Sequence, residues 1–402
     1  MARLTGKLEA GGSKSEVAVK LIWSAYNLCS RNLISWDDVP SRTRIGDMTM
    51  RTRRFAGRLR RVMSLLMLSV LCPWIASGQD QIPEVTIVAT GGTIAGKADT
   101  RTSFQSYRAG QLPIEDMVDE LRPQIDEVAN VTTVQFGNRG SGSYDISDYF
   151  DLTIAVDAAL ETADAVVVTS GTTTMEEFAF WLDLTVRSQK PVVITGAMRP
   201  WTVISSDGPA NLFNSIVLAA SRETHCFGTV LMLNDEFHAA KEVWKSNGMR
   251  LDAFTSRELG ILGYIDEREV RTYRAPPRVQ ACNDRDRWVT PFDLEQISKD
   301  QLPRTEILIG YQGAGLDEAI TAWSDAGVKG IVIAGGRGSE EVVDAAEANG
   351  VVFHQTQRFR TGGDNLYPQK ARLLLMLSLA FSSEPNQIEN WFTRYGFAEF
   401  SQ

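Results

Sequence analysis

Short apolar runs alternate with longer amphipathic segments from residue 83 onward. Runs rich in Val and Ile are typical of buried strands, whereas apolar residues that recur every three or four positions are typical of helices. The pattern predicts strands at Val85–Thr90, Val131–Phe136, Ala165–Thr169, Val192–Gly196 and Gly228–Asn234. It predicts helices at Ile114–Leu121, Ser147–Leu160, Thr174–Arg187 and Ala210–Ser221.

A second, shorter set of alternating elements follows a polar, proline-containing stretch at residues 270–300. Its strands are predicted at Ile307–Tyr311, Gly330–Ala334 and Val351–Gln355, and its helices at Asp317–Asp325, Glu340–Asn349 and Pro368–Phe381. Such alternation favours a parallel sheet with helices on both faces. We predict an α/β fold with a larger N-terminal domain at 79–273, built on a doubly wound, mostly parallel sheet. A linker at 274–300 and a smaller C-terminal α/β domain at 301–402 follow.

The first 78 residues resemble an export signal rather than part of a fold. A basic segment, Arg51–Arg61, precedes the apolar run Val62–Ala76, and the small residues Ala76-Ser77-Gly78 offer a cleavage point before Gln79. The apolar run is shorter than the roughly 20 residues of a membrane-spanning helix. We predict a signal region over residues 1–78 and an exported, periplasmic protein without stable membrane insertion. The alternative is an uncleaved N-terminal anchor.

Charge and cysteine content narrow the possible partners and sites. The chain has 41 basic and 50 acidic residues, of which residues 1–78 carry 13 and 5. Residues 79–402 therefore carry 28 basic and 45 acidic residues. An acidic body argues against nucleic-acid binding, because phosphate contacts need clustered Lys and Arg. Cys226 and Cys282 are the two cysteines beyond the signal, and the sequence leaves open whether they pair. The histidines do not cluster with cysteine at zinc-ligand spacing, so no metal is expected.

Hydroxyl residues follow two of the predicted strands. Val85–Thr90 runs into Gly91-Gly92-Thr93, and Ala165–Thr169 runs into Ser170-Gly171-Thr172-Thr173-Thr174. Ligands of open α/β sheets bind at the carboxyl ends of the strands, so Thr93 is a candidate nucleophile. The alternatives are a plain glycine-rich turn, with or without a phosphate, and threonines that only cap a helix. Lys245, beyond a later strand, taken alone is a candidate surface lysine.

Together these pieces closely resemble the bacterial type II L-asparaginase/glutaminase family of threonine amidohydrolases. The resemblance covers residues 83–402. Ala89–Gly96 (ATGGTIAG) matches the first signature, and Ser170–Glu177 (SGTTTMEE) matches the frame of the second, usually His-Gly-Thr-Asp-Thr-Met-Glu-Glu. Gly196–Ser215 matches the next block, and Lys245 falls on the family's lysine.

The resemblance implies hydrolysis of L-asparagine, L-glutamine or a related carboxamide to the acid and ammonia (EC 3.5.1 class), without a cofactor or metal. Thr93 takes the place of the nucleophile and Tyr107 that of the tyrosine beside it. Thr172 and Lys245 form the pair that positions the attacking group or activates water. Substrate-binding positions fall on Gly92, Ser143, Tyr144, Gly171 and Thr173. The resemblance also implies a homotetramer with shared active sites.

The departures from the family pattern gather at the end of the site that binds the substrate's α-amino and α-carboxylate groups. The family's aspartate is Thr173 here, which cannot carry the negative charge that binds the α-ammonium and completes the relay with the lysine. A carboxylate from elsewhere, such as Asp145, would restore it. The loop usually written Gly-Ser-Gln-Asp is Gly142-Ser143-Tyr144-Asp145, enlarged by residues 138–141. The alternative function is therefore a weakly active or inactive small-molecule binding protein on the same fold.

Overall fold

The computed structural model describes residues 82–256, 259–356 and 366–397. These residues belong to one compact unit, Gln79–Gln402. The signal region at residues 1–78 lies outside the described residues, so its cleavage and the alternative of an anchor stay predictions. Within the described ranges, no helix has the length and apolar character needed to cross a bilayer.

An eight-stranded sheet dominates residues 84–272, with the strand order β12-β11-β8-β7-β6-β5-β1-β4. Strands β4, β1, β5, β6 and β7 pair in parallel, and the edge made by β8, β11 and β12 is antiparallel. The predicted large, mostly parallel sheet is confirmed. The bounds are β1 Glu84–Gly91, β4 Asn130–Arg139, β5 Ala165–Thr169, β6 Val192–Thr195, β7 Thr229–Leu233, β8 Glu236–Ala239, β11 Gly263–Asp266 and β12 Glu269–Thr272.

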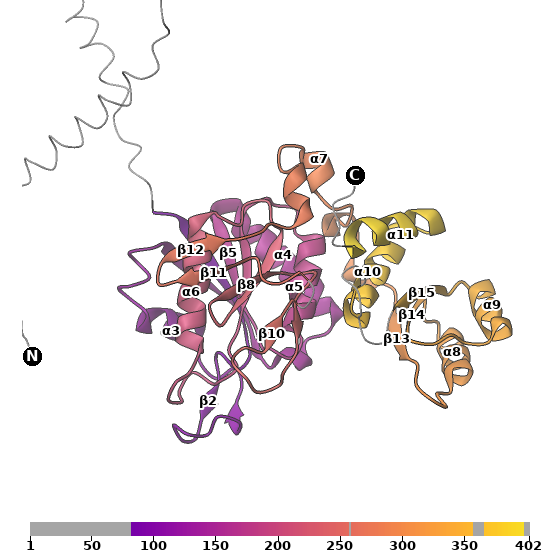
Figure 1. The fold of residues 1–402 in the computed structure, drawn as a ribbon, viewed down its shortest axis with the longest axis horizontal. Helices are drawn as coiled ribbons and strands as arrows, with labels where there is room; N and C mark the ends of the chain where they lie inside the picture. The colour runs from indigo at the N-terminus through magenta and orange to yellow at the C-terminus, as the bar shows by residue number, and fades with distance from the viewer. Residues whose placement is uncertain (1–81, 257–258, 357–365, 398–402) are drawn as a thin grey trace, which may run out of the picture. The chain divides into compact units, whose positions relative to one another are not determined.

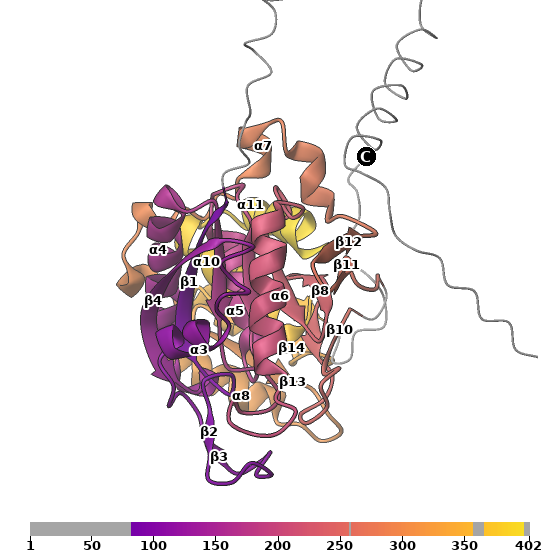
Figure 2. The ribbon, with the colours of Figure 1, turned by 90° about the vertical axis from the view of Figure 1, so that its left-hand side faces the viewer.

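Helices cover both faces of this sheet (Figures 1 and 2). α4 (Ile146–Thr162) and α5 (Met175–Thr185) pack on one face, and α3 (Ile114–Glu120) and α6 (Gly208–Ser221) pack on the other. Within β1, Val88 belongs to the core under α4 and α5, whereas its neighbour Ile87 belongs to the core under α3 and α6. Successive residues of a strand point to opposite faces, so an unbroken apolar run serves both cores.

A smaller parallel sheet lies in the C-terminal part, with the order β13-β14-β15. Its strands are Thr305–Ile309, Gly330–Ala334 and Val352–Thr356. α8 (Leu316–Asp325) and α9 (Glu340–Ala348) share a core with β14 (Figure 1). α10 (Pro368–Phe381) packs against β13 and β14 and also against α5, and it is followed by α11 (Pro385–Trp391) and a π-helical turn, Phe392–Gly396.

The polar stretch predicted as a linker contains buried aromatic residues. It forms the short helical segments Pro277–Ala281, α7 (Arg285–Trp288), Leu294–Gln296 and Lys299–Gln301. The Trp288 and Phe292 side chains are almost fully buried. Charged residues surround both aromatic residues in the sequence, so this apolar content forms no periodic pattern. The exact domain boundaries stay a prediction. In the sequence, the large sheet ends before most of this stretch and the small sheet begins after it.

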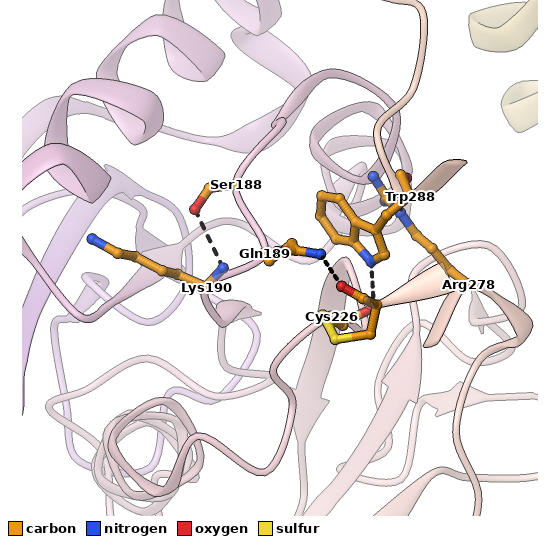
Figure 3. The surroundings of a disulfide bond; sticks show 7 residues. Ser188, Gln189, Lys190, Cys226, Arg278 and Trp288 are labelled. Carbon is orange, nitrogen blue, oxygen red and sulfur yellow. Dashed lines mark hydrogen bonds between the residues drawn. A yellow bond between two sulfur atoms is a disulfide. The ribbon is translucent and has the colours of Figure 1, made fainter. Parts of the chain in front are cut away.

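Cys226 and Cys282 form a disulfide, which answers the question that the sequence left open. It joins the loop between α6 and β7 to the polar stretch (Figure 3). Trp288 donates its indole N–H to the Cys226 carbonyl at 2.9 Å, and the Gln189 side-chain amide donates to the Cys282 carbonyl at 2.7 Å. Arg278 lies over the Trp288 ring at 3.8 Å from its centroid. The disulfide therefore fastens the polar stretch to the main sheet together with several polar contacts.

Candidate active site

The two hydroxyl-bearing loops touch each other at a pair of glycines. β1 and β5 are parallel neighbours, with Ala89 opposite Thr169, so both strands end at the same edge of the sheet. Gly92 follows β1 with φ +83°, and a Cβ built on it would lie 2.2 Å from the Gly171 backbone nitrogen. Only glycine permits both this φ and this approach. The contact brings the Thr93 and Thr172 loops together.

Thr93 is almost buried and shares a 2.7 Å hydrogen bond between its Oγ1 and the Tyr107 hydroxyl. Tyr107 lies in β3 (Tyr107–Arg108), which pairs with β2 (Lys97–Ala98) as a small hairpin. The chain returns from this hairpin to the end of β1, where Gly110 donates its N–H to the Gly92 carbonyl at 3.0 Å. An open hollow of about 370 Å³ lies beside Tyr107.

Lys245 reaches the second loop from another part of the sequence. It lies in β9 (Trp244–Lys245), which pairs with β10 (Phe254–Thr255). Its ammonium donates to the Thr172 hydroxyl at 2.7 Å. Burial lowers the pKa of Lys245 from its ordinary value, and the Glu176 carboxylate partly offsets that effect. A lysine in such surroundings exchanges protons more readily than a solvated one.

A second lysine, Lys370, anchors the segment that leads to Lys245. Lys370 is fully buried at the start of α10. Its ammonium donates to the carbonyls of Ala240 at 2.6 Å and Lys241 at 3.1 Å, and also to the Val243 carbonyl. A buried cation is costly unless its donors are satisfied, so these bonds fix the position of the segment.

The loop after β4 carries the predicted Ser143 and a second serine, Ser141, that was not predicted. The predicted Ser143 is exposed, and its carbonyl accepts a hydrogen bond from Arg139 at 3.1 Å. Ser141 is buried against Gly171, whose Cβ position lies 2.9 Å from the Ser141 nitrogen, and its hydroxyl accepts from the Thr174 N–H at 3.3 Å. The Gly-Ser-x-Asp pattern of this loop points to Ser143, whose contact with substrate stays a prediction, and gives no signal for Ser141.

Tyr144 is part of the core as well as a neighbour of the first loop. It is buried between Phe136 and Phe178, and its hydroxyl donates to the Thr90 carbonyl. Tyr144 thereby supports the end of β1, three residues before Thr93. Its predicted contact with substrate stays a prediction.

Residue 173, where the family has an aspartate, carries no carboxylate in this chain. The sequence suggested Asp145 as a substitute. Thr173 is exposed at the loop. Asp145 is the N-cap of α4, where its Oδ1 accepts from the Ser147 and Asp148 N–H groups at 2.9 and 3.1 Å. The carboxylate found against the lysine segment is Glu176, which accepts a hydrogen bond from the Lys245 backbone N–H. In the sequence analysis, Glu176 has no role beyond its place in the second family signature, Ser170–Glu177.

One group of metal-ligating residue types occurs in the described part of the chain, at the disulfide. The ligand atoms of His225, Cys226 and Cys282 lie within 4.8 Å of one another. The two sulfurs are bonded to each other, so neither offers the thiolate that metals bind. Within the described residues, Thr93, Thr172 and Lys245 do not lie in a group of metal-ligating residue types.

The family model described as "Asparaginase, N-terminal" matches residues 84–278. The chain is 37% identical over 346 residues to L-asparaginase 2 of Bacillus subtilis, an alignment that covers 80% of this chain and 88% of the relative. The chain belongs to the asparaginase family. It is also 37% identical over 339 residues to L-asparaginase 2 of Escherichia coli, with 78% and 94% of the two chains covered.

Two further relatives of this asparaginase-family chain show the breadth of the similarity. The glutaminase-asparaginase of Acinetobacter glutaminasificans is 33% identical over 337 residues, with 77% of this chain and 99% of the relative covered. The crystal structure of a probable cytoplasmic L-asparaginase from Campylobacter jejuni matches with a TM-score of 0.70 and 34% identity, and covers 77% of this chain and 99% of that chain. The predicted family and fold class are thus confirmed.

Proposed function

We propose that this chain is an amidohydrolase that converts L-asparagine, L-glutamine or a related carboxamide into the acid and ammonia. Relatives named L-asparaginase and glutaminase-asparaginase support the substrate class. Two hydrogen-bonded pairs carry the proposal, Thr93 with Tyr107 and Thr172 with Lys245. The loops of the two threonines touch at Gly92 and Gly171. Acyl transfer needs such a nucleophile, a base and a close approach of both to one carbon atom.

In the proposed reaction, the Thr93 Oγ attacks the side-chain amide carbon and forms a bond to it. The C–N bond breaks, and the nitrogen leaves as ammonia with the proton that Thr93 gave up. Water then attacks the resulting ester, which releases the acid and restores the Thr93 hydroxyl. Lys245 and Thr172 are placed to move a proton in one or both steps, because a neutral hydroxyl or water needs a base.

The substrate-binding roles of the two glycines differ in this proposal. The Gly92 N–H already donates to the Arg139 carbonyl at 2.8 Å, so Gly92 contributes the close approach rather than a donor. The loop of Gly171 and Thr172 begins a helix N-terminus, where backbone N–H groups favour negative charge. We assign to that loop the stabilisation of the oxyanion. Ser141 joins Ser143, Tyr144 and Thr173 as a candidate contact for the rest of the substrate.

Ammonia release from a panel of amides by the purified protein tests the proposal. The panel contains L-asparagine, L-glutamine, D-asparagine and succinamate, which is asparagine without its α-ammonium group. Thr93→Ala removes the attacking oxygen, so it should abolish activity, by at least about a thousandfold in kcat. Folded protein that releases ammonia from none of these amides would defeat the proposal.

The replacement of a carboxylate by Thr173 favours a second candidate, a small-molecule binding protein with little or no turnover. Thr173 cannot neutralise an α-ammonium, and removing a charge-assisted hydrogen bond costs about 1.5–3 kcal/mol. Calorimetric titration separates the two candidates, because binding of asparagine without ammonia release supports the second.

Export and assembly are further parts of the proposal. Relatives differ in location by their names: one is a probable periplasmic L-asparaginase of Haemophilus influenzae, and the Campylobacter jejuni protein is called cytoplasmic. The basic and apolar segments before Gln79 support export, and a disulfide suits an oxidising compartment. Mass spectrometry of the mature N-terminus tests cleavage near Gln79. Light scattering of the purified protein tests the proposed homotetramer.

A further inference from the structure

Lys245 is held at both its main chain and its side chain by one short segment. The ammonium donates to the Thr172 hydroxyl at 2.7 Å, and the backbone N–H donates to the carboxylate of Glu176. Thr172 precedes α5 and Glu176 lies in its first turn. The Glu176 contact therefore keeps the main chain of Lys245 beside the same turn that its side chain reaches.

The neighbouring carboxylates have other partners. Glu177, the next residue of α5, lies 3.7 Å from Arg372 on α10. Asp145 caps α4, and residue 173 is an exposed threonine without charge. Among the residues that the structure describes, these contacts single out Glu176 as the anion beside the Lys245 segment.

The charges around Glu176 favour its ionised form against the cost of burial. Burial raises the pKa of Glu176, whereas Lys370 on α10 and Lys245 on β9 lower it. The adjacent Glu177 is the like charge on the same helix, and its pKa is raised by burial and by Glu176 and lowered by Arg372. At Lys245, burial lowers the pKa and Glu176 raises it. The two groups are therefore coupled through their charges as well as through the hydrogen bond.

We propose that Glu176 is a positioning residue for Lys245: it fixes the lysine's main chain and its negative charge stabilises the ammonium beside Thr172. The inference rests on the proposed amidohydrolase function. It gives Lys245 a carboxylate partner in a chain whose residue 173 has none. Lys370 supports the same arrangement from the other side, because it binds the carbonyls just before Lys245.

The test compares Glu176→Gln with the matched control Glu177→Gln, which removes the adjacent carboxylate of α5, whose ion pair is with Arg372. The kcat and KM for the best amide are measured from about pH 5 to about pH 10. We expect Glu176→Gln to lower kcat about tenfold or more with KM changed less than about threefold, because the variant loses the charge that stabilises the Lys245 ammonium but none of the proposed substrate contacts. The limb of the pH profile that reports Lys245 should move to lower pH by at least about half a unit, since a neutral amide no longer stabilises the ammonium. This direction holds whether Lys245 acts as a base or as a cation.

Glu177→Gln should leave that limb where it is and affect mainly the melting temperature. A Glu176→Gln profile with wild-type limbs, or an equal shift in both variants, would overturn the inference while leaving the amidohydrolase proposal intact. Wild-type protein without ammonia release would instead sink the proposed function. Should Glu176→Gln fail to fold, Glu176→Asp keeps the charge but shortens the reach. It should lower kcat with an unshifted limb, and a wild-type kcat in that variant overturns the positioning role.

Discussion

Gly92 lies against Gly171 so closely that no side chain fits between them. A Cβ on Gly92 would stand 2.2 Å from the Gly171 nitrogen and 2.3 Å from its Cα, both of which are backbone atoms that cannot rotate away. The distance between the Thr93 and Thr172 loops is therefore set by main-chain contact. A contact between side chains can relax by rotation about their bonds. This contact is between main chains, so it can change only if the end of a strand moves.

Gly92→Ala should accordingly damage both folding and catalysis. The substitution introduces the overlap with Gly171 at a φ of +83°, so we expect a loss of stability of at least about 2 kcal/mol and a fall in kcat of at least about a hundredfold. Thermal unfolding and ammonia release measure the two effects. Gly140→Ala is the control, because its Cβ meets nothing within 4 Å and its φ is −67°. Equal behaviour of the two variants would contradict the assigned role of the contact.

The pattern of apolar positions was sufficient for the two strands that lead into Thr93 and Thr172, but not for β3 and β9, which carry Tyr107 and Lys245. The strands that lead into Thr93 and Thr172 are nearly continuous apolar runs buried on both faces, which is a clear signal, and Ala165–Thr169 was predicted with its observed bounds. The antiparallel strands β8, β11 and β12 were missed, because each mixes polar and charged residues with few apolar ones and lacks the continuous apolar run of β6, which has the same length. β12 was even included in part in the polar stretch.

The side-chain contacts of the site were predicted less well than the elements. Thr93 was found from its place after a strand, and the roles of Tyr107, Thr172 and Lys245 from resemblance to the family. The structure shows Thr93 bonded to Tyr107 and Thr172 bonded to Lys245. The packing of Ser141 on Gly171 and the Glu176 contact with Lys245 were not predicted. Both depend on how a loop crosses a neighbouring segment, which one sequence does not specify. The same holds for Cys226 and Cys282, whose Cα atoms lie 5.6 Å apart although 56 positions separate them.

Thr172 and Lys245 should act as one unit in catalysis. Thr172→Val removes the hydroxyl that accepts the lysine's hydrogen bond, and Lys245→Met removes its donor. Each substitution is expected to lower kcat by about a thousandfold. The kcat of the double variant should lie within about threefold of that of the less active single variant. Losses that multiply in the double variant would show that the two groups act independently.

Thr173→Asp should change which amide is preferred. An aspartate at this exposed position would offer a carboxylate to the α-ammonium of asparagine, whereas succinamate has no such group. We expect the ratio of kcat/KM for asparagine over succinamate to rise about tenfold or more, in line with a charge-assisted hydrogen bond of about 1.5–3 kcal/mol. Thr173→Asn is the matched variant without charge, and a similar rise in both would mean that charge is not the cause.

The disulfide should stabilise the fold without taking part in the reaction. It closes a loop of 56 positions between the α6–β7 connection and the polar stretch that carries the buried Trp288. Replacing both cysteines, as Cys226→Ala with Cys282→Ala, should lower the free energy of unfolding by about 2–4 kcal/mol. Urea unfolding measures the loss, and wild-type protein with a reductant should show a similar one. The kcat of the folded double variant should stay within about twofold of wild type, because the contacts of Thr93 and Lys245 lie in other loops.

Asp157 should make the protein less stable at neutral pH than at acidic pH. It lies on α4, where burial and the nearby carboxylates of Glu295 and Asp293 raise its pKa to about 7 against the partial opposition of Arg187. Because the folded pKa lies above the unfolded one, its favourable contribution is present below about pH 4 and is lost as the pH rises through about 7. Asp157→Asn mimics the protonated form, so it should add about 1–2 kcal/mol at about pH 8, after allowance for screening, and almost nothing at about pH 4. Urea unfolding at the two pH values measures the difference, with the exposed Glu161→Gln on the same helix as control. A gain of the same size at both pH values would assign the effect to packing instead of ionisation.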